Sequence, residues 1–121
     1  MATIVPTFSK IRGPAGGIDA MIITWAPFAA AGDVGQPLQR IDLADRSVQV
    51  TGTFAASTIV LEGSNDGINY FTLSSPSGAA VSFTAAGLMQ VNQPTAWVRP
   101  HVTVGSGASL TVTLAARRTL R

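Results

Sequence analysis

Apolar and polar residues alternate along much of this chain, in short runs that turn residues separate. Residues 97–104 are the clearest case, because two sets of side chains fall on opposite faces. One face carries Val98, Pro100, Val102 and Val104, and the other carries Trp97, Arg99, His101 and Thr103. Residues 46–54 and 110–114 alternate in the same way. A period of two residues is typical of half-buried antiparallel strands.

Residues 58–73 predict a β-hairpin. Two runs rich in β-branched and aromatic residues flank Ser64-Asn65-Asp66-Gly67, which suits positive φ angles and Asx turns. We expect further strands at residues 21–28, 38–43 (weak) and 81–84, and either a strand or one helical turn at 88–92. About seven or eight short strands without sustained helical periodicity are typical of a β-sandwich or jelly roll. The predicted fold is therefore all-β, a single antiparallel sandwich over residues 20–121.

Residues 1–19 are predicted to form an extended N-terminal arm. Proline and glycine are frequent there, and both disfavour a long regular element. The segment nevertheless holds several large apolar residues, too many for a fully solvated tail, among them Ile4, Val5, Phe8 and Ile11. An arm that becomes ordered on a neighbouring subunit explains both observations, and a disordered N-terminus is the alternative.

Composition favours binding over catalysis. Only 12% of the 121 residues are charged and the mean hydropathy is +0.34, so contiguous apolar surface is expected, which usually marks a partner interface. The net charge is +2, and the basic residues are spread out except for Arg117, Arg118 and Arg121. The sequence contains no basic stripe with interleaved aromatics, and so a nucleic-acid partner is not expected. That C-terminal cluster is interpreted as a solvated tail end, the alternative being contact with phosphates or an acidic surface.

Targeting and membrane signals are missing from the sequence. Residues 20–31 are apolar but too short to span a bilayer, and no signal peptide is evident. We therefore expect a soluble protein without a membrane partner. The absence of cysteine excludes disulfides and thiolate zinc sites, and suits synthesis in a reducing cytosol.

No set of side chains in the sequence predicts a catalytic or metal-binding site. His101 is the single histidine, and no Gly-x-Ser-x-Gly elbow accompanies it, so packing or an interface contact is the better interpretation. Asp66 lies in an oxygen-rich turn that lacks the ligand spacing of a calcium loop, and Asx-turn chemistry accounts for it. We expect no catalytic residue, no cofactor, no metal and no small-molecule substrate.

Large aromatic residues and the apolar arm define the partner interface that we expect. Tryptophan dominates both sandwich cores and interface hot spots, and Trp97 shares a face with charged residues. The predicted interface residues are Ile4, Val5, Phe8, Ile11, Trp25, Phe28, Trp97, Arg99 and His101.

The order of the pieces 58–73, 81–87, 97–104 and 110–114 resembles small structural proteins of tailed bacteriophages, in particular jelly-roll capsid decoration (cement) proteins. This resemblance implies a non-enzymatic virion protein, synthesised in the host cytoplasm and placed on the outer capsid surface. It also implies a dimer or trimer whose partner is the major capsid protein, clamping adjacent subunits.

Residues 62–70 also resemble the strand-turn-strand of discoidin-like carbohydrate-binding modules. A glycan-binding role, or a role as a phage tail or receptor-binding component, is therefore the alternative.

Overall fold

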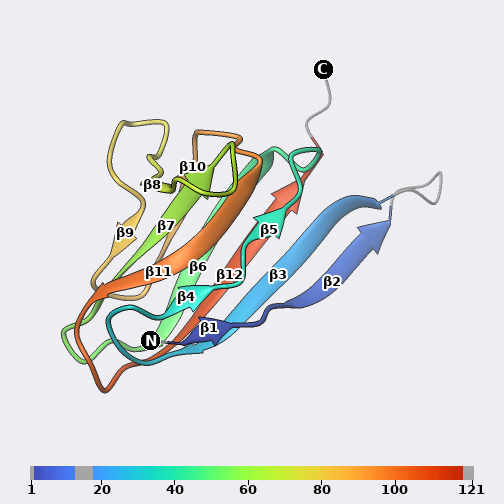
Figure 1. The fold of residues 1–121 in the computed structure, drawn as a ribbon. Helices are drawn as coiled ribbons and strands as arrows, with labels where there is room; N and C mark the ends of the chain where they lie inside the picture. Colours follow the sequence, from blue (N-terminus) through green and yellow to red (C-terminus); the bar gives the residue numbers. More distant parts are fainter. Residues whose placement is uncertain (1, 13–17, 119–121) are drawn as a thin grey trace.

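The computed structural model describes residues 2–12 and 18–118, which form two stacked β-sheets and no helix (Figure 1). The strands are β1 (Thr3–Ile4), β2 (Thr7–Arg12), β3 (Ile18–Phe28), β4 (Val34–Gly35), β5 (Leu38–Gln39), β6 (Asp45–Thr53), β7 (Thr58–Ser64), β8 (Phe71–Thr72), β9 (Ser82–Phe83), β10 (Gly87–Val91), β11 (Trp97–Val104) and β12 (Ser109–Arg117). Since there is no helix in these ranges, none crosses a membrane.

Sheet A has the strand order β1-β4-β11-β7-β8, with β5 on β11 and β9 on β7. Sheet B has the order β10-β6-β12-β3-β2. The alternating positions meet between the sheets, where Val48 and Val50 of sheet B and Val98 and Val102 of sheet A are fully buried. All strand pairs are antiparallel except β1 with β4. The predicted all-β sandwich is confirmed.

Most predicted strands are present, and the differences have local causes. Residues 88–91 fall in a strand, β10, and not in a helical turn, and the strand ends one residue before the predicted segment does. The expected strand at 38–43 stops at Gln39, because a turn closes with a hydrogen bond from the Leu43 amide to the Arg40 carbonyl. Val104 leaves the buried valine face and is exposed, since the pairing of β11 with β7 shifts register after Val102.

The described part of the expected N-terminal arm pairs within its own chain. β1 joins sheet A beside β4, and β2 joins sheet B beside β3. The expected boundary after residue 19 falls inside β3, and residues 13–17 lie outside the described ranges. The structure thus places the arm in both sheets, and its contact with a neighbouring subunit stays a prediction.

The Asp33 carboxylate fastens the start of the chain to the loop after β3. It is buried and accepts hydrogen bonds from the amides of Ala29 (2.9 Å), Ala30 (3.1 Å) and Ala2 (3.0 Å). The amide of Ala29 contributes most to a lowered pKa of Asp33, although burial opposes this shift. The ionised form therefore stabilises the fold.

Replacing Asp33 with asparagine should lower the unfolding free energy by about 1–3 kcal/mol at neutral pH, because the amide places donors against backbone donors. Since the pKa is lower in the folded state, the Asp33 contribution is complete above about pH 4 and is lost as the pH falls through the folded-state pKa. Urea unfolding at neutral pH and at about pH 3 should show a smaller difference from wild type at the acidic pH. An equal difference at both values would contradict this role.

Candidate partner interface

The edge strand β2 exposes apolar side chains on both of its faces. The register of β2 with β3 places Phe8 opposite buried Ile23, on the inner face of sheet B, and Ile11 opposite Ala20, on the outer face. Phe8 and Ile11 are each 51% exposed. Figure 1 shows the reason, because β2 lies at the margin of the sandwich with only β3 beside it. Val5, just before β2, is also exposed, and Ile4 packs partly against the core.

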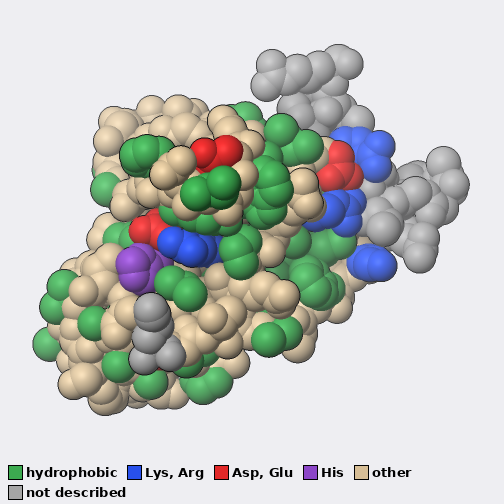
Figure 2. Space-filling model, viewed as in Figure 1, with side chains coloured by type: hydrophobic (Ala, Val, Ile, Leu, Met, Phe, Trp, Pro, Cys, Tyr) green, Lys and Arg blue, Asp and Glu red, His purple; other side chains and the backbone are tan. Residues whose placement is uncertain are grey.

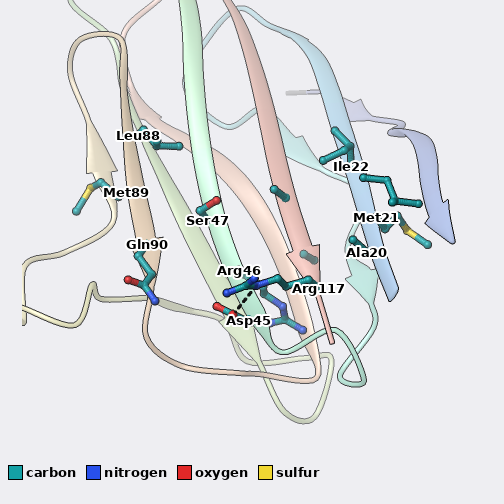
Figure 3. Close-up of a pocket in the computed structure, with 13 residues that line it drawn as sticks. Ala20, Met21, Ile22, Asp45, Arg46, Ser47, Leu88, Met89, Gln90 and Arg117 are labelled. Carbon is teal, nitrogen blue, oxygen red and sulfur yellow. Dashed lines mark hydrogen bonds and ion pairs between the residues drawn. The ribbon is translucent and has the colours of Figure 1, made fainter. Parts of the chain in front are cut away.

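The outer face of sheet B is poor in charge and hollowed near one end. The cross-strand register aligns one row of side chains over all five strands: Ser9, Ile22, Ala115, Ser47 and Gln90. Small side chains, among them Ala20, Ala115 and Ser47, line an open hollow of about 580 Å³. Leu88 and Gln90 lie on one side of it and Ile22 on the other (Figure 3). Leu88 is 67% exposed.

One ion pair lies at one end of the hollow. The Nε of Arg117 lies 2.7 Å from the Oδ2 of Asp45, across the β12–β6 pairing (Figure 3). A hollow with apolar flanks and a neutralised end suits a largely uncharged partner surface more than an ionic ligand.

The outer face of sheet A carries a polar cluster centred on Glu62. Arg99 and His101 of β11 flank Glu62 of β7, with both the Arg99 Nε and the His101 Nδ1 at 3.0 Å from its carboxylate oxygens. The guanidinium of Arg99 also lies 3.9 Å from the centre of the Tyr70 ring. Figure 2 shows the single histidine on this face, beside a basic and an acidic side chain. The His101 ring therefore has a hydrogen-bond partner, the Glu62 carboxylate.

Trp97 packs against the turn that follows β7. Its six-membered ring lies against Gly67, so a side chain there would contact the ring at about 3.3 Å. Within the turn, the Asp66 carboxylate accepts hydrogen bonds from the amides of Ile68 and Asn69 and from two side chains. The backbone amides, Asn69 first, hold the pKa of Asp66 well below its usual range. The Asx-turn interpretation of these residues is confirmed, although the loop between β7 and β8 is longer than a tight hairpin turn.

Two residues of the expected interface lie in the core. Trp25 and Phe28 are fully buried between the sheets, and the Trp25 indole donates to the Gln36 carbonyl at 3.0 Å. A buried side chain offers no surface to a partner, which corrects the expectation for these two residues. The remaining expected residues separate into an edge group (Ile4, Val5, Phe8, Ile11) and a sheet A group (Trp97, Arg99, His101).

Four residues of these two faces were not predicted from the sequence. They are Glu62 and Tyr70 in the polar cluster of sheet A, and Ile22 and Leu88 beside the hollow of sheet B. Glu62 and Tyr70 join Arg99 only through the pairing and the loop geometry. Leu88 faces outward because β10 pairs with β6, which the ambiguous pattern of residues 88–92 did not establish. Among residues 2–12 and 18–118 there is no group of three residues suited to hold a metal ion. The absence of enzymatic activity stays a prediction.

No protein-family model and no curated relative matches the sequence. Among solved structures, the chain is similar in fold to the SPBc2 prophage-derived protein YomS, with a TM-score of 0.58 and 10% sequence identity. That match covers 92% of each chain. A cupin domain of Bordetella pertussis Tohama I aligns over 96% of this chain and 95% of its own, with 11% identity and a TM-score of 0.46. At such identities, the likeness to YomS shows a shared fold and nothing finer.

Proposed function

We propose that this chain is a non-enzymatic structural protein of a bacteriophage particle, a decoration protein that binds the outer capsid surface and clamps neighbouring major capsid subunits. The observation that carries the proposal is the outer face of sheet B, whose hollow is flanked by Leu88 and Ile22 and has its exposed charges paired at one end. Such a face binds through shape, apolar area and hydrogen bonds. The side chains described on it form no converging set of acid, base and nucleophile.

Two further observations support this function. The sequence pattern resembles small capsid decoration proteins, and the fold is shared with a protein from a prophage. A capsid presents the same surface many times, so a modest interface on each subunit becomes strong when two contacts are made at once. A sandwich with one hollowed face that is poor in charge suits that arrangement.

The test is binding to empty capsid shells assembled from the major capsid protein of the same genome. We expect the full-length protein to co-sediment with the shells and to saturate at a fixed ratio to capsid subunits. Leu88→Lys should weaken this binding at least about tenfold, because it places a charge on the neutral face. Ile68→Lys is the matched control, since Ile68 is 80% exposed on the loop between β7 and β8 and should have no effect.

Carbohydrate binding is the competing function, and it predicts the opposite pattern. Its expected site, the loop 64–70, borders an open hollow with exposed Phe71 on its wall. The polar groups there are largely engaged within the protein, since Asp66 serves the turn and the Asn65 side chain accepts from the amide of Ala96. Binding to glycans but not to shells, abolished by Ile68→Lys and kept in Leu88→Lys, would replace our proposal.

A further inference from the structure

β2 has a free edge. It is the last strand of sheet B, and no described strand pairs with its side opposite β3. The backbone N–H and C=O groups on such an edge are ready to pair with another chain. Natural proteins block edges of this kind with charge or proline, and here only Lys10 and the preceding Pro6 do so among the side chains described.

The exposure of β2 indicates what kind of partner fits it. Phe8 and Ile11 are half exposed on opposite faces of the same strand. A surface lying on one face of the sheet would cover only one of these side chains. A strand added to the edge places side chains beside both of them, because its own residues alternate between the two faces. The fitting partner is therefore an extended strand.

We propose that β2 pairs antiparallel with β2 of a second copy of this chain, with Ser9 on the twofold axis. This register places Phe8 opposite Lys10 of the second copy on the inner face, and Thr7 opposite Ile11 on the outer face. Lys10 has no acidic partner among the described residues, and an aromatic ring is a favourable neighbour for its ammonium group. The strand is thus complementary to itself.

The neighbouring registers are less favourable. Moving the axis to Lys10 places the two lysines directly opposite each other, and like charges in that position repel. Moving it to Phe8 brings Pro6 into the ladder, where it has no N–H to donate. The Ser9 register separates the two lysines and leaves Pro6 only at the end of the ladder, opposite Arg12. It also joins the two B sheets into one continuous sheet. Because the second copy supplies the strand, this pairing does not depend on a capsid.

A cysteine cross-link tests the register, since the natural chain has no cysteine. Directly opposite residues in an antiparallel pair are close enough for a disulfide. Ser9→Cys should therefore form a covalent dimer under mild oxidation at micromolar concentration. Gln90→Cys is the matched control, because it lies exposed on β10, the other edge strand of the same sheet. Cross-linking of the Gln90 variant without the Ser9 variant would overturn the proposal.

Sedimentation of the purified full-length protein without capsids gives the second measurement. We expect a reversible monomer–dimer equilibrium, and Ser9→Glu should raise the dissociation constant about fivefold or more by placing two carboxylates on the axis. Ser9 is exposed, so at a concentration low enough for both proteins to be monomeric this variant should unfold at the same urea concentration as wild type. A wild-type monomer up to about 100 µM, a trimer, or an unchanged Ser9→Glu equilibrium would overturn the pairing. A monomer that still binds shells would leave the proposed function standing.

Discussion

Replacing Arg46 with alanine should lower the unfolding free energy by about 3–5 kcal/mol, a large share of the stability of a domain this size. Arg46 points from β6 into the core and is 1% exposed. Its guanidinium donates to three backbone carbonyls, those of Leu43 (2.9 Å), Thr95 (3.0 Å) and Arg40 (2.8 Å). Burial lowers the pKa of Arg46. Alanine would leave the three acceptors without a donor and leave a cavity.

Urea unfolding of matched arginine variants measures this effect. Arg117→Ala is the control, because Arg117 also pairs across strands, with Asp45, but its side chain is 71% exposed. Exposed ion pairs contribute about 0–1 kcal/mol, so the control should be nearly neutral. Arg46→Lys should recover only part of the loss, since one ammonium group does not span three carbonyls set around a planar guanidinium. Equal losses for Arg46→Ala and Arg117→Ala would show that the buried contacts are not the cause.

Replacing Gly52 with alanine should cost about 3 kcal/mol or more, because two penalties coincide there. Gly52 has a φ of +119°, a conformation that side chains rarely adopt. An added Cβ would also collide with the backbone carbonyl oxygen of Ser109 on the neighbouring strand β12. That oxygen belongs to the first residue of β12, which pairs with the end of β6, so moving it aside would disturb the pairing there.

Gly78→Ala separates the two penalties. Gly78 also has a positive φ, +91°, but an added Cβ would meet no atom within 4 Å. Its replacement should therefore cost only the backbone strain, about 1 kcal/mol. Thermal unfolding of both variants gives the comparison. If Gly52→Ala lost no more stability than Gly78→Ala, the collision with Ser109 would be relieved by a local shift of the strands.

The sequence predicted the features that depend on local alternation. In residues 97–104 the pattern correctly separated buried Val98 and Val102 from outward Arg99 and His101, because one face of an antiparallel strand is solvated. It gave no such separation in residues 21–28, where Ile22 and Ile23 are both apolar, and so the burial of Trp25 was not evident.

The features that the sequence did not predict depend on residues far apart along the chain. Arg46 is held in part by Thr95, 49 residues away, and no local pattern predicts a buried arginine on a strand. The pairing of β2 was not predicted for a related reason. The composition of residues 7–12 does not show that the edge of β3 is available for pairing, because that depends on the fold. The hollow on sheet B also depends on residues from five strands, whose order only the fold provides.

The scarcity of charge on the outer face of sheet B affects the conditions under which this face would hold a partner. Salt screens attraction between exposed charges, whereas apolar contacts and backbone hydrogen bonds are hardly screened. The charges described at the hollow form one pair, Arg117 with Asp45, apart from buried Arg46. A complex made through this face would keep its affinity in dilute fresh water and in brine alike, which an ionic interface would not.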